Sequence, residues 1–141
     1  MTGGEPLPET LPERSVEVTP TFVVSTAIAT RDYQDVHHDR DRAVARGSKD
    51  IFVNILTTTG LVQSYVAKWA AEWAGPEATI GGVDIRLGVP CYAYATLVLS
   101  GRVVRREGDE VEVAVTGRVS LGDHVTGKVV VRTGRERGGP A

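Results

Sequence analysis

The sequence predicts one α+β domain in which an antiparallel sheet curves around a single long helix. Apolar residues recur at helical spacing from about residue 50 to residue 73. Several valine-rich stretches between residues 83 and 132 then alternate apolar and polar residues, as strands do, and glycine-containing turns separate them. A helix that is apolar on so many sides has to be covered by other elements, and the sheet supplies that cover.

Length and composition fit a single globular domain. The chain has 141 residues, of which 41% are hydrophobic and 24% are charged, and domains usually hold about 100–200 residues. The net charge of −2 and the scattered basic residues argue against binding to nucleic acid. Cys91 is the only cysteine, which excludes an intrachain disulfide and a paired-thiol metal motif. Neither a signal peptide nor a membrane span is recognisable, so we expect a cytoplasmic protein.

Both ends of the chain are polar and rich in proline, glycine and charged residues, a composition that cannot bury enough surface to order itself. We therefore expect residues 1–14 and 134–141 to be flexible tails on either side of a domain spanning residues 15–133. Residues 15–19 alternate and predict a short strand. Residues 20–30 give conflicting signals, because Thr19-Pro20 is typical of a helix start whereas the β-branched residues that follow favour a strand. Residues 39–46 predict a short helix that Gly47 ends.

The long helix can be capped by Ser48 or Asp50, and Gly75-Pro76 would end it. Its apolar stripe comprises Ile51, Ile55, Val62, Val66, Trp69 and Trp73. Strands are predicted over residues 83–87, 95–105, 110–119 and 125–132, with turns at 107–109 and 121–123. A long helix followed by an antiparallel meander that wraps it is the hotdog architecture.

A cluster of acids and histidines precedes the long helix. It comprises Asp32, Asp35, His37, His38, Asp39 and Asp41. One interpretation is a solvated loop whose acids pair with Arg31, Arg40 and Arg42. A second is a metal site, but the spacing matches no zinc or calcium motif and we assign no metal. The third is acid/base catalysis, and the residues alone leave these interpretations open.

The catalytic interpretation rests on a specific chemistry. The Asp32 carboxylate and the His37 imidazole could hold one water between them and move its proton, provided that burial brings both pKa values toward neutrality. Such a pair adds or removes water at a carbon atom. If the substrate is a thioester, backbone N–H groups at the helix start, near residues 51–54, could bind its carbonyl oxygen as negative charge develops there.

The run RDYQDVHHD at residues 31–39, followed by the long helix and the valine-rich sheet, resembles the MaoC-like enoyl-CoA hydratases and dehydratases. Their motif reads roughly Gly-Asp-x-Asn-Pro-x-His-x-Asp, and Asp32, His37 and Asp39 fall on its Asp, His and final Asp. The resemblance covers about residues 18–131. It implies a hotdog fold, a helix over residues 20–30 and a catalytic pair of Asp32 and His37.

Two departures from the family pattern concern the site. Gln34-Asp35 stands in place of Asn-Pro, and Val53-Asn54 stands where the family usually has His-Gly at the start of the helix. The resemblance implies that the backbone N–H of Asn54 binds the thioester oxygen and that Val53 lies at the substrate. Because a side chain replaces the glycine, we expect an acyl pocket shaped differently from that of short-chain relatives.

Residues 24–66, 87–94 and 121–127 show a more extended similarity to the small subunits of heteromeric MaoC-like hydratases of actinobacterial cholesterol side-chain degradation. This resemblance implies hydration of a steroid enoyl-CoA with a three-carbon side chain, which gives a tertiary alcohol at the ring carbon. It also implies a larger partner subunit, with its own MaoC-like domain and a DUF35 domain, in a heterotetramer. CoA would arrive as part of the substrate, and no metal or redox cofactor is expected.

Two other functions stay open. The chain could be a non-catalytic subunit that shapes an acyl-CoA or steroid pocket for its partner, although the presence of both Asp32 and His37 argues against this. It could also be a hotdog thioesterase, which would release free CoA. Trp69 and Trp73 are expected in the core or at a subunit interface, residues 90–94 interrupt the sheet and could border the pocket, and His124 is expected to be structural or exposed.

Overall fold

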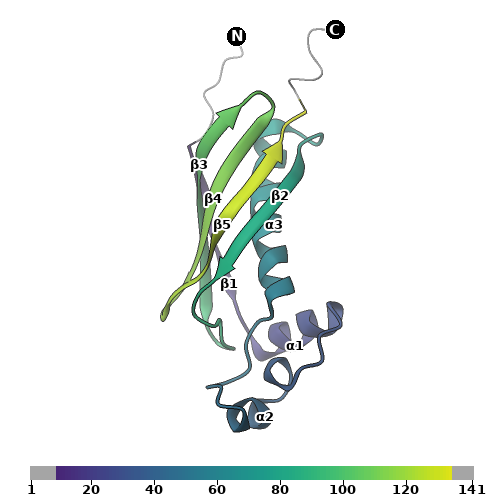
Figure 1. The fold of residues 1–141 in the computed structure, drawn as a ribbon, viewed down its shortest axis with the longest axis vertical. Helices are drawn as coiled ribbons and strands as arrows, with labels where there is room; N and C mark the ends of the chain where they lie inside the picture. The colour runs from purple at the N-terminus through teal and green to yellow at the C-terminus, as the bar shows by residue number, and fades with distance from the viewer. Residues whose placement is uncertain (1–8, 135–141) are drawn as a thin grey trace.

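The structure, a computed structural model, describes residues 9–134 (Figure 1). Its elements are β1 (Thr10–Glu17), α1 (Pro20–Ala29), the 3₁₀ turn η1 (Asp35–His37), α2 (Arg40–Ala45), α3 (Ile55–Ala74), β2 (Thr79–Leu87), β3 (Thr96–Glu107), β4 (Glu110–Val119) and β5 (Gly122–Arg132). Among the described residues, five strands form one antiparallel sheet that packs against α3, which confirms the predicted α+β hotdog architecture. No helix in this part of the chain has the length and apolar character needed to cross a membrane.

The order of strands in the sheet is β1-β3-β4-β5-β2. The first strand of the chain therefore lies at one edge, where Glu17 is opposite Thr96 of β3, and β2 forms the other edge, where Val83 is opposite Val129 of β5. Figure 1 shows α3 running along one face of the sheet, while α1 and α2 gather at the end where α3 begins. The acid- and histidine-rich segment lies at this end of the molecule.

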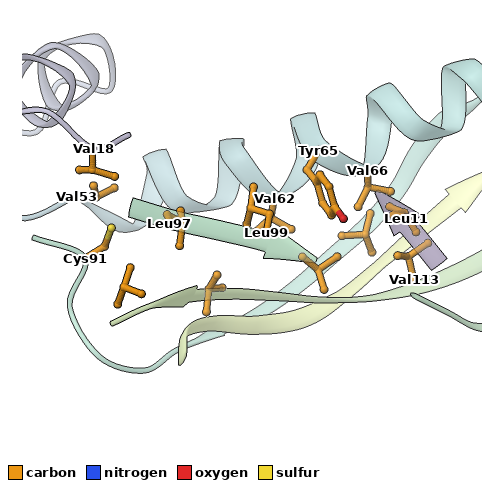
Figure 2. Close-up of a cluster of buried hydrophobic side chains, with 14 of the residues drawn as sticks. Leu11, Val18, Val53, Val62, Tyr65, Val66, Cys91, Leu97, Leu99 and Val113 are labelled. Carbon is orange, nitrogen blue, oxygen red and sulfur yellow. The ribbon is translucent and has the colours of Figure 1, made fainter. Parts of the chain in front are cut away.

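The core forms between α3 and the inward faces of the strands (Figure 2). Every second residue of β4 is buried from Val111 onward, as alternation along a half-buried strand requires. The helix contributes Val62, Val66 and Trp69. Cys91 is fully buried in the same cluster, and burial raises the pKa of its thiol to about 11, so it acts as a small apolar residue.

The predicted start of the long helix was wrong by several residues. α3 begins at Ile55, and its N-cap is Asn54, whose Oδ1 accepts a hydrogen bond from Thr57 N–H at 2.9 Å. Residues 51–53 are extended instead, because their backbone pairs with residues 91–93: Val53 N–H donates to the Cys91 carbonyl and Ala93 N–H to the carbonyl of residue 51, both at 3.0 Å. The predicted helix end at Gly75 is confirmed, and this residue adopts φ 93°.

The predicted N-terminal tail is also corrected. Residues 10–14 belong to β1, where Thr10 lies opposite Arg102 and Leu11 is buried in the core. The Tyr65 hydroxyl donates to the Pro12 carbonyl at 2.8 Å, so α3 also holds this strand. β2 and β5 likewise begin earlier than predicted, at Thr79 and Gly122. Of the two predicted tails, residues 1–8 and 135–141 lie outside the described residues.

The ambiguous stretch after β1 is a helix, as the family resemblance implies. Thr19 is its N-cap, and its Oγ1 accepts a hydrogen bond from Phe22 N–H at 3.0 Å, with Pro20 at the first helical position. Capping and burial of Val23 and Ala27 therefore outweigh the strand preference of the β-branched residues.

His124 is a structural residue with 3% exposure. Its Nδ1–H donates to the Val89 carbonyl at 2.7 Å, and its Nε2 accepts from the Thr58 hydroxyl at 2.8 Å. The ring thus ties β5 to α3 and to the segment after β2. Burial lowers the pKa of His124, and the hydrogen bond to Val89 opposes this only in part.

We expect the stability of the protein to fall as the pH is lowered below 6.5, the ordinary pKa of histidine. Below this pH the unfolded chain takes up a proton at His124 that the folded chain does not bind, at a cost of at most about 1.4 kcal/mol per pH unit. Urea unfolding at several pH values gives the free energy of unfolding at each pH. Below pH 6.5 this free energy should change less steeply with pH for His124→Gln than for the wild type. The same pH dependence of the unfolding free energy in both proteins would show that His124 is not its cause.

Candidate active site

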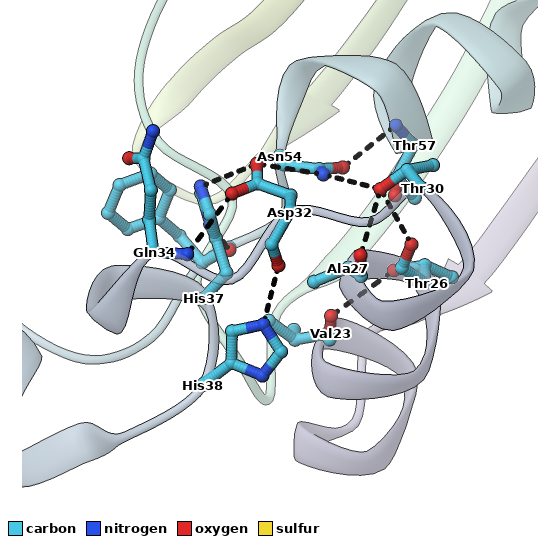
Figure 3. Close-up of polar contacts among 11 residues, drawn as sticks. Val23, Thr26, Ala27, Thr30, Asp32, Gln34, His37, His38, Asn54 and Thr57 are labelled. Carbon is cyan, nitrogen blue, oxygen red and sulfur yellow. Dashed lines mark hydrogen bonds and ion pairs between the residues drawn. The ribbon is translucent and has the colours of Figure 1, made fainter.

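Asp32 and His37 lie together where α1, η1 and the start of α3 meet (Figure 3). Arg31 has φ 60°, and Asp32 N–H donates back to the Ala27 carbonyl at 2.8 Å, so the chain turns sharply at the end of α1. η1 then turns it again and returns His37 to the same place. The Nε2 atom of His37 is 3.4 Å from Oδ2 of Asp32. The structure therefore brings the predicted pair together.

The orientation of the His37 ring is fixed by the segment before α3. Nδ1 lies 2.7 Å from the Phe52 carbonyl oxygen, which can only accept, so Nδ1 carries a hydrogen. In the neutral ring the lone pair is then on Nε2, the nitrogen that faces Asp32. The Phe52 ring also packs nearly perpendicular to the imidazole, with centroids 5.0 Å apart. Because His37 is only 6% exposed, these contacts leave it little freedom.

The Asp32 carboxylate accepts hydrogen bonds at both oxygens. Asn54 Nδ2 donates to Oδ2 at 3.1 Å, and Gln34 N–H donates to Oδ1 at 3.2 Å. His38 Nε2–H donates to the backbone carbonyl of Asp32 at 2.6 Å and fixes the main chain there. The side chain of Asp32 remains 22% exposed, so a small molecule can still reach it.

The condition that burial brings the Asp32 pKa toward neutrality is not met. Burial acts to raise the pKa of Asp32, but the hydrogen bonds from Asn54 and Gln34 and the charges of His37 and His38 outweigh it, and the pKa lies below its ordinary value of 3.8. Asp32 is therefore an anion throughout the neutral range. Its contribution to stability is complete above pH 3.8 and is lost as the pH falls through the lower, folded-state pKa.

The two residues predicted at the helix start behave differently. Val53 donates its N–H to the Cys91 carbonyl at 3.0 Å, and its side chain is 4% exposed in the core. Whether Val53 contacts substrate stays a prediction. No acceptor among the described residues is bonded to the backbone N–H of Asn54, which lies at the start of α3. Its role as a donor to a thioester oxygen stays a prediction.

The other acids of the cluster fit the interpretation as a solvated loop. Asp35 forms an ion pair with Arg46 at 3.1 Å, and Asp39 is the N-cap of α2, where it accepts from Arg42 N–H at 3.1 Å. In residues 9–134, no three His, Cys, Asp or Glu side chains are grouped closely enough to hold a metal ion.

Residues 90–94 support the site indirectly. The Tyr92 ring packs edge-on against Phe52, with centroids 6.2 Å apart, and Phe52 in turn holds His37. A cavity of about 270 Å³ lies beside this segment, and Tyr92, Tyr94 and Arg40 are among its lining residues.

The tryptophan pair lies farther along α3. Trp69 is buried in the core and stacks on Trp73, with centroids 5.5 Å apart, which confirms the prediction of a core position for Trp69.

Sequence reasoning missed three groups that organise the site. They are the side chain of Asn54, the hydroxyl of Thr30, which accepts from Asn54 Nδ2 at 2.8 Å, and the carbonyl of Phe52. Asn is a preferred N-cap residue, so its place directly before the helix was a usable signal. The carbonyl gives no sequence signal, since every residue has one.

The pKa of Asp32 should be measurable below 3.8 by ¹³C NMR titration of its carboxyl carbon. Replacement of His37 by Gln removes a positive charge that favours the carboxylate, so we expect the Asp32 pKa to rise in this variant. Asp41→Asn, on the exposed side of α2, serves as a control that should leave the value unchanged. An Asp32 pKa that is the same with and without His37 would show that the two side chains do not interact.

Known proteins place this geometry in a family. The chain is 60% identical over 119 residues to the 3-oxo-4,17-pregnadiene-20-carboxyl-CoA hydratase beta subunit of Mycobacterium tuberculosis (strain ATCC 25618 / H37Rv). The aligned residues cover 84% of this chain and 89% of the relative. A chain in the crystal structure of the ChsH1-ChsH2 complex from Mycobacterium tuberculosis superposes with a TM-score of 0.82 at 56% identity, over 94% of this chain and 98% of that one.

More distant structures share the fold. The (R)-hydratase from A. caviae involved in PHA biosynthesis has a TM-score of 0.74 at 16% identity, over 94% of this chain and 98% of its own. No protein-family model matches the sequence. The identity and coverage of the mycobacterial relative settle the relationship: the chain belongs to the MaoC-like hydratases of hotdog fold, in the family of the 3-oxo-4,17-pregnadiene-20-carboxyl-CoA hydratase beta subunit.

Proposed function

We propose that this chain is the catalytic small subunit of an enoyl-CoA hydratase that adds water to a steroid enoyl-CoA derived from the cholesterol side chain. The observation that carries the proposal is the pairing of Asp32 Oδ2 with His37 Nε2 at 3.4 Å, next to the N-terminus of α3. The 60% identity to the mycobacterial hydratase beta subunit supports it. Both groups point to the same place, and Asp32 is reachable from solvent.

The geometry suits one water molecule held by both side chains. Oδ2 of Asp32 and the lone pair on Nε2 of His37 can each accept one hydrogen of that water, which leaves an oxygen lone pair free to attack the β-carbon of the substrate. Because its pKa is low, Asp32 stays ionised and polarises the water throughout. Nε2 of His37 can take the proton as the new C–O bond forms, and Asp32 stabilises the imidazolium that results.

The same site can complete the remaining steps of the reaction. As oxygen bonds to the β-carbon, the electron pair of the C=C bond moves to the α-carbon and onto the thioester oxygen. The Asn54 N–H, at the positive end of α3, is placed to bind that oxygen. His37 then returns the proton to the α-carbon, and the hydrated product forms with no metal or redox cofactor.

The substrate and the partner follow from the relative. That protein is named a beta subunit and a hydratase of a pregnadiene-carboxyl-CoA, and the matching structure is a complex of two proteins. We extend these assignments to this chain, with hydration yielding a tertiary alcohol on the steroid ring. The partner would be a larger MaoC-like subunit with a DUF35 domain, in a heterotetramer. CoA thioesters are intracellular metabolites, so the proposal includes a cytoplasmic location.

The direct test follows the loss of enoyl-thioester absorbance on a steroid enoyl-CoA, with the chain alone and with its larger partner. We expect hydration only in the presence of the partner, and a fall in kcat/KM of about 10²–10⁴-fold for Asp32→Asn and for His37→Ala, the range typical of lost acid/base catalysis. Asp41→Asn is the matched carboxylate control and should retain activity, since it lies outside the site.

Two outcomes of this experiment would overturn the proposal. Activity that survives both substitutions would move the chemistry to the partner and make this chain a binding subunit. Release of free CoA thiol without a hydrated product would identify a thioesterase instead.

A further inference from the structure

We propose that the side chain of Asn54 is a positioning residue that fixes the Asp32 carboxylate for catalysis. It does so by joining this carboxylate to the N-terminus of α3 and to the C-terminus of α1. The inference rests on the proposed function, because it assigns Asn54 a part in orienting the carboxylate that activates water. It concerns the side chain and is separate from any role of the Asn54 backbone N–H.

The orientation of the Asn54 amide is determined by its neighbours (Figure 3). The Thr57 N–H can only donate, so the atom it meets at 2.9 Å is the oxygen, Oδ1. Nδ2 then lies on the other side, where one hydrogen reaches Thr30 Oγ1 at 2.8 Å and the other reaches Asp32 Oδ2 at 3.1 Å. The Thr30 hydroxyl is free to accept because its own hydrogen goes to the Thr26 carbonyl at 2.9 Å or to the Ala27 carbonyl at 3.1 Å.

The oxygen of Asp32 that Asn54 holds is the one that faces His37. Oδ2 accepts from Asn54 Nδ2 and lies 3.4 Å from His37 Nε2. Asn54 is 3% exposed, and three hydrogen bonds restrain its amide. Without this donor the carboxylate is held at Oδ1 by the Gln34 N–H, so Oδ2 can shift and the gap that holds the water is less well defined. A misplacement of about 1 Å at a reacting group can cost about a hundredfold in rate.

The same contact acts on the charge of Asp32. A hydrogen bond from Asn54 favours the ionised carboxylate, in agreement with the lowered pKa of Asp32. The pKa of Asp32 therefore reports on the positioning role and not on helix capping. Loss of a cap lowers stability, whereas loss of the Nδ2 donor also changes the titration of Asp32.

Two substitutions separate capping from positioning. Serine and aspartate at position 54 both keep an oxygen that can accept from Thr57 N–H, since both are good N-cap residues. Neither offers the amide hydrogens that reach Asp32. Asn54→Asp matches the shape of asparagine and places a second negative charge beside Asp32. Asn54→Ser is neutral. Thr19→Ala is the matched control, because it removes the N-cap of α1 at the opposite end of that helix from Thr30.

The experiment measures three quantities on the full-length chain: the thermal midpoint, the Asp32 pKa by ¹³C NMR, and kcat and KM in the complex with the larger subunit. We expect the Asp32 pKa to rise in Asn54→Ser, and to rise further in Asn54→Asp because of charge repulsion. We also expect kcat to fall about 10- to 100-fold, with KM changed less than about threefold. Thr19→Ala should lower the thermal midpoint and leave the Asp32 pKa and kcat unchanged.

An unchanged Asp32 pKa in both Asn54 variants, or an unchanged kcat, would overturn the inference and reduce Asn54 to a helix cap. The NMR titration decides the contact with Asp32 even if the wild-type complex shows no hydratase activity. In that case the proposed function fails on the activity assay, and the titration still reports separately on the role of Asn54.

Discussion

The site depends on a short backbone pairing between residues 51–53 and residues 91–93. Val53 N–H and the carbonyl of residue 51 exchange hydrogen bonds with the segment that leads into β3. This pairing keeps the chain extended up to Asn54, so that α3 can begin only there. It also points the Phe52 carbonyl at His37, while Phe52 N–H donates to the Val36 carbonyl at 3.1 Å and holds η1 in place. One extended segment therefore positions both the histidine and the residue that holds the aspartate.

The carboxylates around the site differ in the groups that they contact. Asp35 lies against arginines, as does Asp50, whose Oδ1 is 3.6 Å from Arg40 Nε. The Asp32 carboxylate instead contacts an amide, a backbone N–H and the imidazole of His37. The amide and the backbone N–H are neutral donors that stabilise the anion. Asp32 thus keeps its charge and its access to a ligand at the same time.

Much of the fold could be predicted because its signals are local. Alternation along residues 110–119, the end of α3 at Gly75 and the capping residue Thr19 are all visible in the sequence. The errors involve contacts between distant segments. Ser48 and Asp50 are good capping residues, and Ile51 and Val53 are apolar, so local rules extend the helix backwards. Only pairing with residues 91–93 prevents this. In the same way, residues 10–14 have the composition of a tail and are ordered by pairing with β3.

The site was predictable in its identity but not in its geometry. The spacing of Asp32 and His37 and the family resemblance indicated the pair, whereas the Asn54 amide and the Phe52 carbonyl act from a segment about 20 residues farther along the chain. The direction of the Asp32 pKa shift depends on those contacts, so burial alone does not predict it.

The central claim is that Asp32 and His37 together hold the water that is added to the substrate. A crystal structure of the complex with its hydrated steroid acyl-CoA product tests it most directly, because the new hydroxyl oxygen marks where that water was. We predict that this oxygen lies within hydrogen-bond distance of both Asp32 Oδ2 and His37 Nε2. A product hydroxyl bound to residues of the larger subunit, away from this pair, would contradict the account.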